Sequence, residues 1–425
     1  MSPIYKVSVT SCLLFVFLNE ANAVSMNYSL EGGVYNSDNI QRDTTNIKDT
    51  VTILSAGLQV NGQSKTNNID LLMNVENRTY KNNTYTNDTR GLVDLKSNWG
   101  ILEKTITWTL NGLYGQTRID PYTVITPNNL QNVGYFSTGP NASLILTTAD
   151  RLNFSAYYNQ YYAEIANTDN TSGRYNINYT RDINTYTSVS LNTNYNDVNY
   201  DDPGNLDFTR FDYFINFTRS TSISELRINY GTSDLEFETA DTLNGDFKRL
   251  SFSYKINRSN SVELGFVDEI DDGASNLDGT TVDSTIAAGN LFRNQAGLLG
   301  YQYKRDPIYL GFIFRYADED FLATDGSQDD FDRKLKSGRI NAVFGSGQNL
   351  QLTLSFLREN FDYYVRGQDD TEDTMNIRLS KRLGGNVSIG LEGQRFTRES
   401  VSSTPTQDIT ENQYMIFVSY QSRNH

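Results

Sequence analysis

Long segments in which apolar and polar residues alternate constrain this chain more than any other feature of its sequence. Residues 210–219 (RFDYFINFTR) place four aromatic or aliphatic side chains, Phe211, Tyr213, Ile215 and Phe217, on one side of an extended strand. Successive side chains of a β-strand point to opposite faces, so this period of two predicts a strand with one apolar and one polar face. The same pattern recurs in 246–256, 307–318 and 348–361.

The length of these segments decides which kind of β-protein they favour. Strands of soluble sandwiches average about 5–6 residues, whereas a tilted strand that crosses a bilayer needs about 9–11. The alternating segments run for about 10–13 residues. They therefore predict strands that span a membrane, with the apolar face toward lipid and the polar face toward an enclosed aqueous space.

Connections between the predicted strands alternate between short turns and long polar loops. The strands are expected at 26–35, 49–60, 66–77, 89–100, 104–115, 133–147, 150–162, 172–181, 185–197, 207–219, 223–233, 246–256, 260–269, 291–304, 307–318, 333–345, 348–361, 370–382, 385–397 and 409–421. Short periplasmic turns, long extracellular loops and an even strand number are typical of bacterial outer-membrane barrels. We therefore predict an all-β fold, a single closed antiparallel transmembrane β-barrel of about 20 strands, with 18 or 16 as alternatives.

The first 23 residues have the features of a cleaved secretory signal peptide. Lys6 precedes an apolar run at 7–18, and Ala21-Asn22-Ala23 matches the A-x-A cleavage pattern. The chain is thus expected to comprise a signal peptide (1–23) and one barrel (24–425), which passes the inner membrane and inserts into the bacterial outer membrane. Because the single cysteine, Cys12, lies within the predicted leader, the barrel has no disulfide or thiolate ligand.

Two stretches resemble the β-barrel porins that bacteria encode with exopolysaccharide and capsule export loci. Residues 28–40 (YSLEGGVYNSDNI) resemble the first strand of these porins and the Asp-Asn loop after it. Residues 135–146 (YFSTGPNASLIL) resemble a strand with a Ser-x-Gly-Pro element, which a tight turn joins to the aromatic strand 151–162. The resemblance implies an outer-membrane role in, or near, the secretion of a surface polysaccharide.

Charged residues on the polar faces are the candidates for the wall of a pore. Charges that face a water-filled lumen influence ion and solute selectivity, although a polar interior is also required by hydration alone. We predict that the lumen is lined by Arg210, Asp212, Glu225, Arg227, Arg249, Lys255, Lys304, Arg315, Arg339, Arg378, Arg382 and Glu392. The segments 116–132 and 270–290 are candidates to fold inward as constrictions, and outward projection is the alternative.

Aromatic residues near strand ends are expected to form girdles at the membrane interfaces. The residues concerned are Trp99, Trp108, Tyr157, Tyr158, Tyr161 and Tyr162. Paired tyrosines also resemble surfaces on which sugars stack, but a barrel requires girdles and does not require sugar sites.

The sequence argues against catalysis and against nucleic-acid binding. Its only histidine, His425, is the final residue, so a histidine-based nucleophile or metal site within the wall is not available. The net charge of −15 is opposite to the basic footprint of a nucleic-acid-binding protein. We expect no catalytic residue, no cofactor and no metal site.

These observations predict a passive channel. It would support surface polysaccharide export or the diffusion of small polar solutes, in contact with outer-membrane lipid and lipopolysaccharide and, in the first case, with polysaccharide or export components. The alternative is a barrel that conducts nothing and serves as a platform, whose long acidic loops bind polysaccharide or a partner protein. The sequence does not indicate an oligomeric state.

Overall fold

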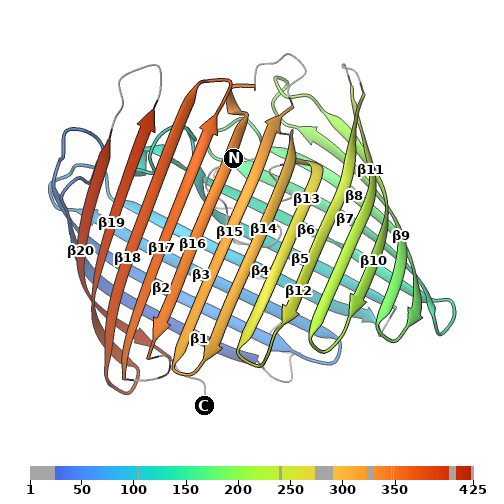
Figure 1. Ribbon diagram of the computed structural model, residues 1–425, viewed down its shortest axis with the longest axis horizontal. Coiled ribbons are helices and arrows are strands. Elements are labelled where there is room, and N and C mark those ends of the chain that lie inside the picture. Colours follow the sequence, from blue (N-terminus) through green and yellow to red (C-terminus); the bar gives the residue numbers. More distant parts are fainter. Residues whose placement is uncertain are drawn as a thin grey trace.

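Twenty antiparallel strands form a single sheet that closes into a barrel, as predicted (Figure 1). The structure is a computed structural model that describes residues 24–103, 105–238, 242–272, 291–322, 329–345, 347, 349–401 and 408–422. Each strand pairs with the next one along the chain, and β1 pairs with β20 to complete the ring. The predicted signal peptide (1–23) lies outside the described residues.

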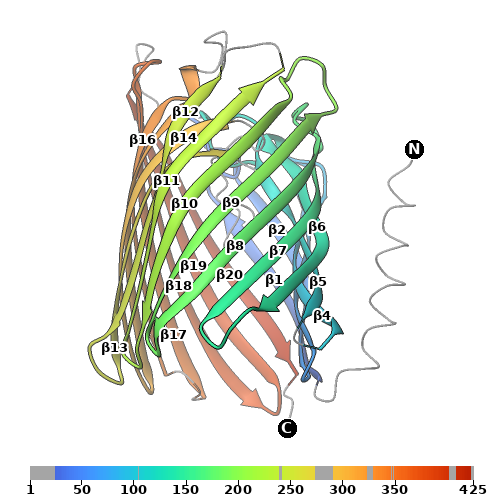
Figure 2. The ribbon, with the colours of Figure 1, turned by 90° about the vertical axis from the view of Figure 1, so that its right-hand side faces the viewer.

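The strands alternate in direction around the wall and cross it obliquely (Figure 2). Their bounds are β1 Val24–Ser37, β2 Asp49–Gln63, β3 Asn67–Tyr80, β4 Asp88–Leu102, β5 Ile106–Arg118, β6 Leu130–Ile145, β7 Asp150–Ala163, β8 Asn170–Asn184, β9 Thr187–Tyr200, β10 Phe208–Ser220, β11 Ser224–Phe237, β12 Leu243–Lys255, β13 Asn260–Asp272, β14 Leu291–Arg305, β15 Ile308–Phe321, β16 Arg333–Phe344, β17 Leu350–Tyr363, β18 Gln368–Gly384, β19 Val387–Val401 and β20 Ile409–Gln421. Within the described residues, the short 3-10 turns η1 (Pro127–Asn129) and η3 (Asp329–Phe331) lie in loops. Among the described residues, no helix has the length and apolarity needed to cross a membrane.

Short turns join the strands at one end of the barrel, and this end also holds the start of β1 and the end of β20. These turns range from two residues (185–186) to five (345–349). The connections at the opposite end, here called the loop end, are longer except at 238–242 and 364–367. Residues 364–367 form a connection as short as a turn, because β17 and β18 continue past the predicted strand ends.

Most strands are longer than the apolar pattern predicted because the backbone ladder continues beyond the apolar stripe. β8 spans 170–184 instead of 172–181, and β18 spans 368–384 instead of 370–382. A tilted strand of about 14 residues rises roughly 35 Å along the barrel axis, which exceeds the apolar band of about 25 Å. The extra residues include both polar and apolar side chains and lie mostly toward the loop end.

The register assigns one apolar face to the outside of the barrel. Large apolar side chains on this face are strongly exposed, including Leu30 (53%), Leu54 (61%) and Ile416 (62%). The other face is concave, because Arg378 on β18 contacts Glu31 on β1 across the two intervening strands. We call the concave side the lumen face.

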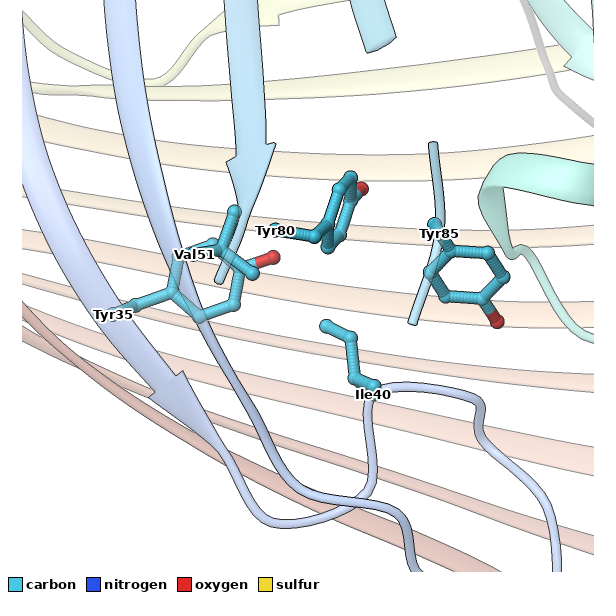
Figure 3. Close-up of a cluster of buried hydrophobic side chains, with 5 residues drawn as sticks. All are labelled: Tyr35, Ile40, Val51, Tyr80 and Tyr85. Carbon is cyan, nitrogen blue, oxygen red and sulfur yellow. The ribbon is translucent and has the colours of Figure 1, made fainter. Parts of the chain in front are cut away.

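Buried apolar clusters fill the lumen side of the loop end. In one of them, Tyr35, Val51 and Tyr80 project from β1, β2 and β3. They contact Ile40 and Tyr85, which lie in the loops that follow β1 and β3 (Figure 3). The rings of Tyr80 and Tyr85 pack edge to face with centroids 5.5 Å apart. Loops at this end therefore fold over the strand ends and narrow the opening.

Candidate functional site: the lumen and its constriction

The connection between β5 and β6, residues 119–129, folds into the lumen. We call it the constriction segment. Its own hydrogen bonds hold it in shape, since the Asn129 amide donates to the carbonyl oxygens of Asp120 at 2.9 Å and Val124 at 3.1 Å. Val124 is buried against Phe396 and Ile409 on β19 and β20. Of the candidate 116–132, residues 119–129 therefore fold inward, while 116–118 and 130–132 belong to β5 and β6. Most of the other candidate, 270–290, lies outside the described residues.

Tyr122 at the tip of the constriction segment contacts the opposite wall. Its ring packs against Tyr363 on β17 with centroids 4.9 Å apart, and it stacks on Phe331 of η3 at 5.6 Å. Its hydroxyl donates to the carbonyl of Asp330 at 2.6 Å. Burial raises the pKa of Tyr122 to about 12, although the nearby Arg366 guanidinium acts in the opposite direction. The hydroxyl therefore stays protonated and remains a donor at physiological pH.

Two guanidinium groups, one buried and one partly buried, attach the backbone of the constriction segment to the wall. Arg398 on β19 donates to the carbonyl of Tyr122 and forms an ion pair with Asp370 at 2.7 Å. Arg42 donates to the carbonyl of Ile125 at 3.1 Å and pairs with Glu411 at 2.7 Å. Because each arginine is already neutralised by a carboxylate, it can hold a neutral backbone carbonyl without an uncompensated charge.

Further buried ion pairs reinforce the lumen face at the loop end. Arg118, where β5 ends, pairs with Glu372 on β18 at 2.8 Å, and both side chains are about nine-tenths buried or more. Arg333 pairs with Glu319 at 2.6 Å, with 2% and 1% of the two side chains exposed. The first pair connects strands distant in sequence across the lumen, so it also limits the movement of the constriction segment.

A polar recess of about 180 Å³ lies lower on the lumen face. Arg378 forms one side of it, pairing with Glu392 at 2.6 Å and with Glu31, while its guanidinium lies 3.7 Å above the ring of Phe417. The ring fits there because Gly390 has no side chain, and a Cβ at this position would clash with it. The recess thus offers fixed donors and acceptors to a solute in the lumen.

By register, all twelve predicted lining residues belong to the lumen face, and they fall into two groups. The paired group comprises Arg210–Asp212 (2.8 Å), Arg227–Glu225 (2.5 Å), Arg249–Glu269 (2.5 Å), Arg315–Glu319 (3.5 Å) and Arg378–Glu392 (2.6 Å). The second group, Lys255, Lys304, Arg339 and Arg382, forms no ion pair within the described part of the chain. A role of any of these twelve residues in solute selectivity stays a prediction.

Sequence reasoning missed the residues that hold the constriction. Arg398 lies one residue beyond the predicted strand 385–397, and Arg42 and Tyr122 belong to loops. A usable signal was present, because Arg398 continues the polar alternation of β19 past its apolar stripe. No group of histidine, cysteine, aspartate and glutamate residues that could hold a metal ion occurs among the residues the structure describes.

The girdle prediction is correct for only some of its tyrosines. Trp99 and Trp108 face each other on the outer face near the short-turn end, and Tyr158 and Tyr162 are exposed on the same face. Tyr161, by contrast, lies on the lumen face and is 2% exposed. In a run of consecutive tyrosines only alternate residues can face lipid, so the others must face the lumen.

The closed barrel, the polar lumen face and the inward segment define the class of protein as a transmembrane-type β-barrel with a constricted interior. No known protein family matches the sequence, and no curated protein is significantly similar to it. The comparison of structures, in contrast, finds many barrels of similar architecture.

Solved structures similar to this chain include an iron transporter and porins. The FrpB iron transporter from Neisseria meningitidis (F3-3 variant) is 11% identical, with 95% of this chain and 82% of that chain covered and a TM-score of 0.50. OccAB3 from Acinetobacter baumannii is 12% identical over 94% and 99% of the two chains, with a TM-score of 0.42. OccK2 from Pseudomonas aeruginosa, solved in complex with glucuronate, is 8% identical over 94% and 98%, with a TM-score of 0.40.

The likeness to FrpB shows a shared barrel fold and nothing finer. The neighbours are outer-membrane porins and transporters, and none of them shows the link to exopolysaccharide export loci that the sequence resemblance implied.

Proposed function

We propose that this protein is a channel of the bacterial outer membrane through which small polar solutes diffuse. The observation that carries the proposal is the combination of an exposed apolar outer face with a lumen face of charged and amide side chains. A ring of about 20 strands has a backbone diameter near 40 Å, which is more than wall side chains can fill. Below the constriction segment, the interior is therefore wide enough for water and solutes.

The constriction sets the size of solute that the proposed channel admits. Buried clusters and the constriction segment occupy the lumen at the loop end, whereas residues such as Lys255, Lys304 and Arg339 nearer the short-turn end are exposed. Export of a surface polysaccharide, the finer function that the resemblance implied, would require residues 119–129 to leave the lumen. We therefore place diffusion of small polar solutes first.

Electrical recording of the refolded protein in planar bilayers tests the proposal. The wild type should give discrete, ohmic current steps, and a variant in which a short Gly-Ser turn replaces residues 119–129 should give larger ones. Liposome swelling gives the size limit, with monosaccharides entering through the wild type and larger oligosaccharides entering only through the deletion variant. If neither form conducts although both are folded, the proposal is wrong and the alternative, a platform that binds partners through its loops, is favoured.

A further inference from the structure

The outer face of the barrel changes abruptly from apolar to charged toward the loop end. On β16 the outward sequence runs from Ile340 through Gly338 to Lys336, and on β17 it runs from Phe356 to Arg358. On β18 and β19, Met375 lies opposite Arg395. The last apolar residues of these strands therefore lie within two outward positions of a cation on the same strand or opposite one on the next strand.

These outward cations occupy only one side of the barrel. They lie on strands between β12 and β19, and they are Lys248, Arg293, Lys334, Lys336, Arg358 and Arg395. At the same level, β20 and β1 to β11 expose no lysine or arginine on the outer face within the described ranges. Carboxylates lie opposite four of these cations in the register, whereas Lys336 and Arg395 have no carboxylate opposite them and are available to an external anion.

Three of the cations are the least engaged with the protein itself. Lys248 and Arg293 are held by Asp246 and Asp268, and Lys334 lies over the ring of Tyr364. Lys336 and Arg395 form no ion pair among the described residues. Arg358 is 59% exposed and has only a loose contact of 3.7 Å with Asp373, which leaves most of its five N–H donors available.

The three cations follow the edge of the apolar stripe from β16 to β19, and Arg395 borders a hollow beside Phe356 and Met375. Lys336 and Arg358 are diagonal neighbours across β16 and β17, a relation that separates residues by about 7–8 Å. This cavity of about 470 Å³ has an apolar side formed by Phe356 and Met375, beside Arg395, and a polar side toward the loop end; its lining residues are Phe356, Asp373, Met375, Arg395, Thr397, Arg398, Glu399, Asp408, Ile409 and Thr410. Phe356 and Met375 remain 37% and 46% exposed, and Ile340 beside them is 50% exposed.

We propose that Lys336, Arg358 and Arg395 bind the phosphate groups of a phosphorylated glycolipid in the outer leaflet, with its acyl chains against Ile340, Phe356 and Met375. Guanidinium and ammonium groups are the side chains that recognise phosphate, and the adjacent apolar surface matches the other half of an amphipathic lipid. A free anion would gain nothing from this apolar surface. The inference rests on the proposed function, because it assigns the loop end to the outer leaflet.

Stabilisation by lipid A tests this site in the full-length, refolded protein. Diphosphoryl lipid A is added to the protein in neutral bicelles, and its affinity is obtained from the rise in the unfolding temperature that the heat-dependent gel shift reports. The variant K336Q/R358Q/R395Q should bind the lipid on the order of 100-fold more weakly, since each cation near a lipid surface contributes about a fivefold effect. Dephosphorylated lipid A should stabilise the wild type no better than it stabilises this variant.

A matched control removes outward cations from the opposite rim of the same wall. Arg181 on β8 and Lys381 on β18 are exposed on the outer face next to the short turns, and R181Q/K381Q should keep the wild-type affinity. If the triple variant does not refold, R395Q alone should weaken binding about fivefold.

Three outcomes would overturn the inference. They are equal binding by the triple variant and the wild type, equal stabilisation by phosphorylated and dephosphorylated lipid, and loss of the lipid effect on addition of inorganic phosphate, which would identify a free anion as the ligand. Conductance is recorded in parallel in plain phospholipid bilayers. A barrel that binds the lipid and conducts no current would contradict the proposed channel and leave the lipid site intact.

Discussion

Buried arginines on the lumen face show how single residues keep a polar interior stable. Arg333, Arg118 and Arg398 are each almost fully buried beside a carboxylate. A buried charge is tolerated when its partner and hydrogen bonds compensate for lost hydration, whereas removal of one partner leaves the other uncompensated. These pairs therefore fix the geometry of the loop end more than they add net stability.

Substitution of Glu319 by Gln should strongly destabilise the barrel. The change leaves Arg333 buried without its counter-charge, and Arg315, 3.5 Å away, loses the same partner. The expected loss is about 3–5 kcal/mol in the free energy of unfolding, measured by urea titration in lipid vesicles. Glu225→Gln, in a pair whose side chains are 40–61% exposed, should change it by less than about 1 kcal/mol. Similar losses for the two variants would contradict this account.

A side chain at position 390 should disturb the recess around Arg378. In Gly390→Val the new methyl groups take the place of the Phe417 ring, and Arg378 then loses the aromatic surface beneath it. Large residues forced into a packed site typically cost about 1–3 kcal/mol. We expect a lower urea midpoint and altered open-channel noise, with Gly338→Val as the control because nothing lies within 4 Å of a Cβ there. An unchanged midpoint for Gly390→Val would show that Phe417 has room to move.

Among the elements, strands and loops differ in how far the sequence determines them. The two-residue period of a strand is local, so residues 210–219 alone predict β10 and its two faces. The fold of residues 119–129 depends instead on Tyr122 meeting Phe331 and Tyr363, more than 200 positions away, and no local pattern contains that information. Strand number, closure and the faces of the lining residues were therefore predictable, but the anchors of the constriction were not.

Loss of the Arg398 side chain should loosen the constriction segment while the barrel stays closed. Arg398→Gln removes the donor to the Tyr122 carbonyl and the ion pair with Asp370. We expect larger and noisier current steps in planar bilayers, in the direction of the variant without residues 119–129. Arg181→Gln serves as control, since Arg181 is exposed on the outer face next to the short turns. Current steps with the size and noise of the wild type in Arg398→Gln would mean that Arg42 and the aromatic contacts suffice to hold the constriction segment in place.

At the scale of the whole molecule, the net charge of −15 does not describe the lumen. Many lumen charges neutralise one another in pairs such as Arg210–Asp212 and Arg78–Glu76. Much of the acidic excess lies in the loops and on the outer face. The field that an ion meets in the pore therefore differs from the one that the composition suggests.

The channel should consequently discriminate only weakly between K⁺ and Cl⁻. Their permeability ratio, from reversal potentials in a KCl gradient, should lie within about threefold of unity and approach it at high salt, where the Debye length falls to about 3 Å. Replacement of Lys255, Lys304, Arg339 and Arg382 by Gln should shift the ratio toward K⁺, because these four cations have no carboxylate partner among the described residues. A strongly cation-selective wild type would show that the loops control the current instead.

The pairing of β1 with β20 has a consequence for how the molecule is made. Until residues 409–421 are available, β1 and β19 each present an open row of backbone donors and acceptors, and such a row readily recruits strands from other chains. A polypeptide that began to assemble before its synthesis was complete would thus expose two unpaired strand edges until β20 was made. The ring architecture therefore favours delivery of the finished polypeptide in an unassembled state, with the last strand completing the wall in one concerted event.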